Sequence, residues 1–195
     1  MATSSRPTRE EILSVLDYEP KTGVFRWRSR LKRPTWWTQS TSAMNSWTPE
    51  KWNRRWAGKI AGTPNCRTGE IVMRFGKGDI KAHHIAWLVS YGEWPSSLLD
   101  HKNGNVADNR IANLRAATAS QNVMNGKLRS TNKSGYKGVH YRPESKKNPW
   151  RACITVNYKR QTLGHFPSPE AAYLVYCAAA RELHGEFARP ERRQI

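Results

Sequence analysis

The sequence predicts a protein of the α+β class, built from two small modules that both meet a polyanion. Its 195 residues suffice for one medium-sized domain or two small ones. Short segments that alternate apolar and polar residues stand beside segments in which apolar residues recur at helical spacing. Lys and Arg number 33 against 15 Asp and Glu, which gives a formal net charge of +18. Such an excess indicates a polyanionic partner.

The composition excludes several classes of protein. Apolar residues make up 37% of the chain and 9 residues are Trp, which is too apolar and aromatic for a disordered basic tail. No apolar run approaches the roughly 20 residues of a membrane span, and residues 1–9 lack the apolar segment of a secretory signal. The cysteines Cys66, Cys153 and Cys177 lack zinc-ligand spacing, so we expect small core residues in a reducing, cytoplasmic protein.

The first third of the chain predicts a short helix, a strand and an insertion. Thr8 precedes two acidic residues and an apolar run, which predicts a capped helix over residues 8–15. Residues 24–28 alternate as a half-buried strand does. Residues 29–55 form a Trp-rich insertion without a clear period, with at most one helix near residues 49–56. Its role is not predicted.

The middle of the chain holds the candidate active site. Residues 70–75 and 79–82 flank a Gly-Lys-Gly turn and predict a hairpin, and residues 83–91 have helical spacing. A polar, Asn-rich stretch over residues 98–125 follows. Such a stretch is unusual as a loop in a purely structural protein. We therefore expect the chemistry there.

The last third predicts a linker followed by a small sheet and one helix. The linker is expected to be exposed, because Lys, Arg, Ser, Thr, Asn and Gly dominate it. Three alternating segments predict strands, with a tight turn at residues 157–159, and a helix runs from the cap Ser168 to Gly185. The predicted boundaries are 1–125 for the first domain, 126–133 for the linker, 134–189 for the second domain and 190–195 for a basic tail.

Four residues of the Asn-rich stretch can carry chemistry. Asp100 and His101 are adjacent, and Asn113 and Asn122 follow. A hairpin followed by a helix can fold back so that Asp100 and Asn122 meet one metal ion while His101 points at substrate. Carboxylate and amide oxygens suit Mg²⁺ or Mn²⁺ better than zinc, and a neutral imidazole can activate water. The alternative is structural, since such residues also occur by chance in turns and at helix caps.

The runs DHKNGN, DNRIANLR and SQN, preceded by AHHIAWLVSYGEWP, resemble the HNH endonucleases of phage and homing type over residues 16–125. The resemblance implies a ββα-metal (HNH, His-Me finger) nuclease core around one divalent ion. It implies Asp100 and Asn122 as metal ligands, His101 as general base, and Asn113 as the residue that braces the hairpin and helps to hold the base.

The chain departs from this family at one pair of residues. The family commonly shows His-Arg where this chain has His83 and His84. His83 matches the family histidine and His84 replaces the arginine. We expect both at the start of a helix, in the core or in contact with phosphate, with weaker positioning of DNA if the arginine normally contacts the backbone.

Basic and aromatic residues alternate on the predicted C-terminal strands, so side chains of both kinds can share one face of the sheet and contact DNA. The alternative is a solvated charged face with Trp150 in the core. The runs SGYKGVHY, WRACITVNYKRQTLGHF and SPEAAYLVYCAAARELHGEFAR resemble the APETALA-two/ethylene-response-factor (ERF) domain over residues 134–189. The resemblance implies a three-stranded antiparallel sheet that packs on one helix and binds DNA. The predicted DNA contacts are Lys137, His140, Arg142, Trp150, Arg151, Lys159, Arg160 and Thr162.

Together these features predict an Mg²⁺- or Mn²⁺-dependent endonuclease of homing type that hydrolyses or nicks phosphodiester bonds in duplex DNA. We expect a phage-encoded monomer in the cytoplasm of a bacterial or phage-infected cell, with no small-molecule cofactor and no membrane partner. The alternatives are a catalytically inactive DNA-binding regulator and an RNA-binding protein. The target sequence and the choice between nick and double-strand cut are not predicted.

Overall fold

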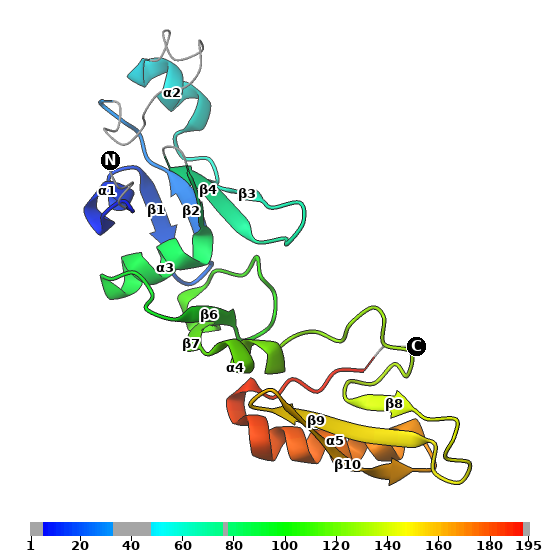
Figure 1. Cartoon of the computed structure of the whole chain (residues 1–195). Helices are drawn as coiled ribbons and strands as arrows, with labels where there is room; N and C mark the ends of the chain where they lie inside the picture. The colour runs from blue at the N-terminus through cyan, green and yellow to red at the C-terminus, as the bar shows by residue number, and fades with distance from the viewer. Residues whose placement is uncertain (1–5, 33–47, 76–77, 193–195) are drawn as a thin grey trace, which may run out of the picture. The chain divides into compact units, whose positions relative to one another are not determined.

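The computed structural model describes residues 6–32, 48–75 and 78–192, and the chain divides into two compact units, Met1–Ala116 and Ala117–Ile195 (Figure 1). Both units combine helices with small sheets, in agreement with the predicted mixed class. Within these residues, no helix has the length and apolar character needed to cross a bilayer.

The first unit begins with a capped helix and a hairpin. A capping box joins Thr8 and Glu11 at the start of α1 (Arg9–Leu13). The helix is shorter than predicted because β1 (Leu16–Glu19) follows at once and pairs antiparallel with β2 (Val24–Trp27). The pairing with β2, which the sequence does not reveal, makes an extended segment of the residues after α1.

The helix predicted within the Trp-rich insertion is confirmed as α2 (Pro49–Trp56), capped by Thr48. It buries Trp52, and the guanidinium carbon of Arg30 lies 3.7 Å from the centre of that ring. Such a cation–π contact fixes the end of β2 against the helix. The predicted insertion also includes residues 33–47, which lie outside the described residues.

A three-stranded sheet and one helix complete the core of the first unit. The predicted hairpin is confirmed, with a third strand added at one edge, and α3 ends at Gly92 in the left-handed region. The elements are β3 (Thr63–Pro64), β4 (Ile71–Phe75), β5 (Gly78–Lys81) and α3 (Ala82–Tyr91). The deeply buried apolar side chains around α3 include Ile12, Leu16, Phe25, Met73, Ile85 and Ala86.

The Asn-rich stretch forms two strands and a helix in succession. β6 (Leu98–His101) pairs with β7 (Leu114–Ala117), and the 3₁₀ turn Ile111–Asn113 leads into β7. Thr118 and Gln121 form a capping box at the start of α4 (Ala119–Met124). The contacts place α4 with the second unit, so the division of the chain falls before the predicted boundary at residue 125.

The second unit contains the predicted sheet and helix. Its strands lie in the order β10–β9–β8, both pairs are antiparallel, and α5 begins at the cap Ser168. The predicted turn is a two-residue hairpin at Asn157 and Tyr158, both with positive φ, as such turns require. The elements are β8 (Val139–Tyr141), β9 (Trp150–Val156), β10 (Lys159–Phe166) and α5 (Pro169–His184).

The predicted linker, residues 126–133, is fastened to the second unit. Lys137 Nζ donates hydrogen bonds to the carbonyl oxygens of Met124, Gly126 and Arg189, at 2.8, 2.6 and 3.0 Å. The backbone N–H of Leu128 donates to the Glu191 carboxylate at 2.5 Å. Composition correctly predicts exposed side chains here, but these contacts with residues far along the chain hold the backbone in place.

The cysteines are free thiols, and two of the three follow the prediction. Cys153 on β9 and Cys177 on α5 are buried, as expected for small core residues. Cys66 is exposed, because it lies in the polar turn between β3 and β4 rather than on a strand.

Candidate active site

The strand β6 carries Asp100 and His101, whose side chains are buried to 4% and 5% exposure. Arg115 on the paired strand β7 donates from Nε to Asp100 Oδ2 at 2.9 Å, and its Nη2 lies 2.8 Å from the same oxygen. A buried carboxylate needs such a partner to offset its lost hydration. The sequence analysis missed Arg115, because only the pairing of β6 with β7 brings the two residues together.

His101 lies in a cluster of histidine rings. Its ring meets that of His83 edge-on, with the centroids 4.9 Å apart, and His83 meets His84 in the same way at 4.6 Å. Burial lowers the pKa of His101 below its ordinary 6.5, against opposing effects of a hydrogen bond with Asn109 and the charge of Asp100. The imidazole is therefore neutral at pH 7, the form that accepts a proton.

His83 is more deeply withdrawn from water than His101 is. It lies in the first turn of α3 with 3% of its surface exposed, as the helix-start prediction requires. Burial, followed by the neighbouring histidines and Lys81, lowers its pKa to about 3. His83 is therefore a neutral packing partner for His101 across the physiological range.

Asn113 braces the loop that follows His101. Its side-chain oxygen accepts from the backbone N–H of Asn103 at 3.0 Å, and its side-chain nitrogen donates to the carbonyl of Asp108 at 2.8 Å. Its own carbonyl accepts from the N–H of Lys102 at 2.8 Å. These bonds tie both ends of the loop to one buried side chain, which is the geometry that a bracing residue requires.

The N-terminal hairpin supports the same loop from outside. Tyr18 on β1 donates its hydroxyl to the carbonyl of Asn109 at 2.8 Å. Gly23 has a φ of +73°, and a Cβ there would lie 2.4 Å from the backbone nitrogen of Arg110. Only glycine allows the loop to come this close. Residues far from the motif in sequence thus position the loop beside His101.

The donor chemistry at Asp100 fits a hard divalent cation. Arg115 contacts Oδ2 of Asp100, and proteins commonly bind Mg²⁺ through carboxylate oxygens. Among residues 6–32, 48–75 and 78–192, no group of three or more His, Cys, Asp or Glu side chains is arranged to hold a metal. A cation at Asp100 would thus depend on amide, water and phosphate oxygens, as Mg²⁺ accepts. Asn122 is exposed on α4 of the second unit, and its pairing with Asp100 remains a prediction.

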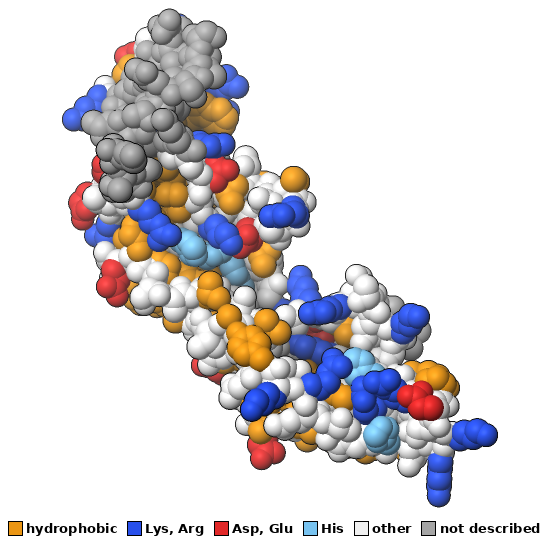
Figure 2. Space-filling model, in the orientation of Figure 1, with side chains coloured by type: hydrophobic (Ala, Val, Ile, Leu, Met, Phe, Trp, Pro, Cys, Tyr) orange, Lys and Arg blue, Asp and Glu red, His pale blue; other side chains and the backbone are white. Residues whose placement is uncertain are grey.

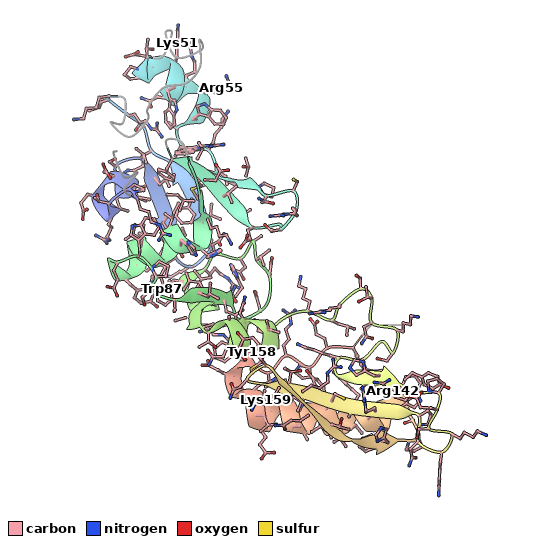
Figure 3. The ribbon with its side chains drawn as sticks, viewed as in Figure 1. Lys51, Arg55, Trp87, Arg142, Tyr158 and Lys159 are labelled. Atoms are coloured by element: carbon pink, nitrogen blue, oxygen red, sulfur yellow. The ribbon has the colours of Figure 1, made fainter. Side chains whose placement is uncertain are left out.

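The second unit presents an open, basic sheet face. Ala152 and Ile154 on β9 pack toward α5, so the alternate residues of this strand lie on the other face. In register on that face are the pairs His140 with Arg151, Cys153 with Thr162, and Thr155 with Arg160. Figure 3 labels Arg142 and Lys159 at opposite ends of the sheet, and Figure 2 shows Lys and Arg gathered around histidines on this unit.

The positive charges of this face converge on His140. Burial lowers its pKa, and the charges of Arg160, Arg151 and Arg142 lower it further. Like charges held close together repel one another, and a bound anion would offset this repulsion. The structure therefore brings together most of the predicted DNA contacts on one surface.

Three predicted DNA contacts do not belong to this face. Lys159 pairs in register with Val156, which packs toward α5. All three N–H donors of the Lys137 ammonium point to backbone carbonyls, and burial lowers its pKa to about 8. Trp150 packs on the α5 side against the cluster of Val139, Ala152 and Ala172. The alternation along β9 puts Trp150 on the face opposite Arg151. The side chains of Lys137 and Trp150 stabilise the unit, and their contact with DNA stays a prediction.

Comparisons with known proteins agree with the motif. The family model for HNH endonucleases matches residues 81–124. "Protein 3.8" of Escherichia phage T7 is 32% identical over 110 residues, which are 56% of this chain and 88% of that protein. The chain belongs to the HNH endonuclease family. A second relative, "Uncharacterized HNH endonuclease L560" of Acanthamoeba polyphaga mimivirus, is 32% identical over 117 residues, which are 59% of each chain.

The HNH family match spans α3, β6, β7 and α4, and so includes Asp100, His101, Asn113 and Asn122. The chain thus spans less than two thirds of the length of the mimivirus relative. No solved structure matches the chain. The HNH model ends at residue 124, so the ERF resemblance of the second unit stays a prediction.

Proposed function

We propose that this chain is a metal-dependent endonuclease that hydrolyses or nicks phosphodiester bonds in duplex DNA. The observation that carries the proposal is the buried, neutral His101 beside Asp100, on a strand pair that lies within the HNH match. A neutral imidazole withdrawn from bulk water suits a general base, and an adjacent carboxylate suits a cation.

Each residue of the site has a separate task in this proposal. His101 takes the proton from the attacking water, while the ring of His83 and the loop braced by Asn113 hold its orientation. Arg115 fixes the carboxylate of Asp100 in place. When bound by Asp100 and Asn122, Mg²⁺ or Mn²⁺ would polarise the scissile phosphate and stabilise the leaving oxygen.

The second unit acts as the DNA-binding module in this proposal, with the ERF-type sheet as its contact surface. The convergence of Arg142, Arg151 and Arg160 on His140 supports an anionic ligand there. A module that holds DNA raises the effective concentration of substrate at the nuclease. The viral sources of both relatives support a virus-encoded enzyme. The proposal keeps the phage origin, the homing type, the monomeric state and the host cytoplasm that the sequence analysis expects.

A nicking assay on supercoiled plasmid tests the proposed activity. With Mg²⁺ or Mn²⁺, the full chain should convert the plasmid to the relaxed form if it nicks, or to the linear form if it cuts both strands, and EDTA should stop the reaction. A preparation that binds plasmid tightly but leaves it intact at every metal concentration would instead identify a DNA-binding regulator.

A further inference from the structure

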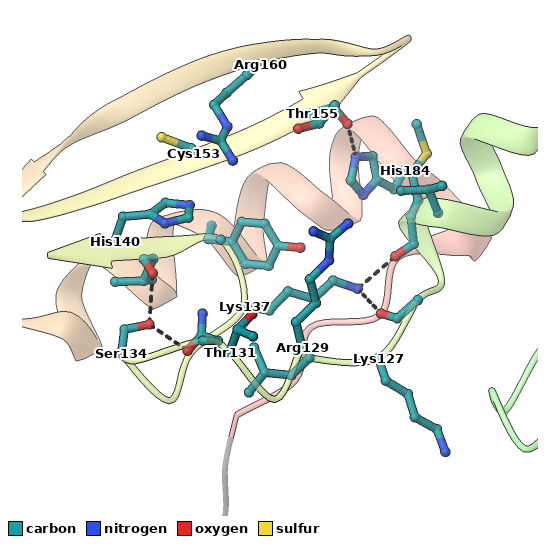
Figure 4. Close-up of a pocket in the computed structure, with 18 of the residues that line it drawn as sticks. Lys127, Arg129, Thr131, Ser134, Lys137, His140, Cys153, Thr155, Arg160 and His184 are labelled. Atoms are coloured by element: carbon teal, nitrogen blue, oxygen red, sulfur yellow. Dashed lines mark hydrogen bonds between the residues drawn. The ribbon is translucent and has the colours of Figure 1, made fainter. Parts of the chain in front are cut away.

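The second unit contains a groove of about 890 Å³ between residues 126–134 and the sheet (Figure 4). No Asp or Glu occurs among the described side chains that line it. The cations that line it are Lys127, Arg129, Lys133, Lys137 and Arg160. A concave surface with cations alone concentrates positive potential and attracts anions.

One wall of the groove is the segment predicted as a linker. Lys137 and Glu191 fasten its first residues, as described above. At its other end, the Asn132 side chain accepts from the N–H of Gly135 at 2.7 Å and donates to the Tyr136 carbonyl at 3.0 Å. The backbone is thus anchored at both ends, which is unexpected for a tether that only spaces two domains.

The cationic side chains of this wall are not neutralised by the acidic residues that the structure describes. Lys127, Arg129 and Lys133 are exposed and form no ion pair with the acidic residues that the structure describes. In Figure 4 the side chain of Arg129 extends toward the sheet. An anchored backbone lowers the conformational entropy that the segment would lose on binding.

The opposite wall is the open face of the sheet. Arg160 lies in register with Thr155, and Figure 4 shows its guanidinium directed into the space between the walls. His140 lines the same space, and Arg151 and Arg142 extend the positive surface beyond it. The two walls therefore form one continuous basic surface.

We propose that this groove binds the phosphate backbone of duplex DNA, so that residues 127–133 are part of the DNA-binding surface. The inference rests on the proposed function and adds contacts that neither resemblance implies. Phosphates fit better than an acidic protein segment, because the cations continue from the groove along the sheet as evenly charged backbone requires. Arg129 and Arg160 would then hold phosphate oxygens from the two walls.

The salt dependence of DNA affinity tests the groove. In the full chain, with EDTA to prevent cleavage, fluorescence anisotropy gives the affinity for a labelled duplex over a range of salt concentrations. Arg129→Gln should make the negative slope of log K against log salt shallower by about 0.9, and adding Lys127→Gln should roughly double that change. The matched control is Arg181→Gln, an exposed arginine on α5 that does not line the groove.

The outcomes separate this inference from the proposed function. If Arg129→Gln and Arg181→Gln both keep the wild-type slope while Arg151→Gln on the sheet makes the slope shallower, the sheet binds DNA and the groove proposal fails. If the wild-type chain prefers structured RNA to duplex DNA, or binds neither, the proposed function fails as well. Unchanged melting temperatures of the variants confirm that each comparison is between folded proteins.

Discussion

The strand pair β6–β7 and the open sheet face of the second unit handle charge in opposite ways. Asp100 is almost fully buried and has a dedicated partner in Arg115. On the sheet side, Arg129 and Arg160 stand in a groove whose described lining contains no acidic residue. A group that performs chemistry must be desolvated and fixed, whereas a group that binds a polyanion must stay accessible. The first requirement depends on contacts distant in sequence, whereas the exposed cations of the sheet face follow from local alternation.

The largest expected effect of a charge change is on the buried pair. Arg115→Met should lower the free energy of unfolding by about 3–5 kcal/mol, because it removes the cation that offsets the buried Asp100 carboxylate. Urea denaturation measures this loss. The control Arg74→Met breaks an exposed pair with Asp79 and should cost about 0–1 kcal/mol. Equal losses in the two variants would contradict the contrast between buried and exposed charge.

A backbone contact gives the next largest effect. Gly23→Ala should lower stability by about 1–3 kcal/mol more than Gly58→Ala, because its new methyl group collides with the site loop. Gly58 has a similar positive φ, +77°, but nothing lies within 4 Å of its Cβ position. The pair therefore separates steric contact from backbone strain. Cleavage should fall in Gly23→Ala alone, and a matching fall in Gly58→Ala would remove the hairpin from its supporting role.

A smaller effect concerns the buried histidine of α3. The folded-state pKa of His83 is about 3, below its ordinary 6.5, so the unfolded state binds the proton first as the pH falls. His83 therefore stabilises the fold above pH 6.5, and this contribution is lost progressively toward pH 3. The loss should be on the order of 1 kcal/mol per pH unit at most.

Denaturation of the wild type and of His83→Gln at several pH values measures this slope. The wild type should lose stability more steeply than the variant between pH 6.5 and pH 4, with the two curves parallel above pH 7. A slope unchanged by the substitution would show that His83 is not held neutral by burial, and it would weaken the comparison between the two regions.

The sequence predicted the features that local pattern determines. Capping residues mark α1 and α5, and a two-residue turn marks the β9–β10 hairpin, because these signals lie within a few residues of each other. Asp100 and His101 were found for the same reason, as adjacent members of one motif. The basic sheet face followed from alternation along β9.

The features that the sequence did not reveal all depend on distant contacts. Arg115 and Tyr18 gain their roles through strand pairing and the approach of the N-terminal hairpin. In the sequence, Lys137 is a basic residue beside a predicted strand. In the structure its ammonium donates to three backbone carbonyls, and two of these belong to residues that precede the predicted second domain. Composition alone cannot distinguish an exposed tether from an anchored segment with exposed side chains.

The most direct test of the central claim is single-turnover cleavage of duplex DNA by the full-length His101→Ala variant at saturating Mg²⁺. The rate should fall by about 10²- to 10⁴-fold, as loss of a general base predicts. DNA affinity should stay at the wild-type value, because the proposed binding surface belongs to the second unit. The melting temperature should fall only modestly from loss of the buried ring, and it must stay above the assay temperature. Full cleavage by a folded, metal-saturated His101→Ala protein would contradict the account.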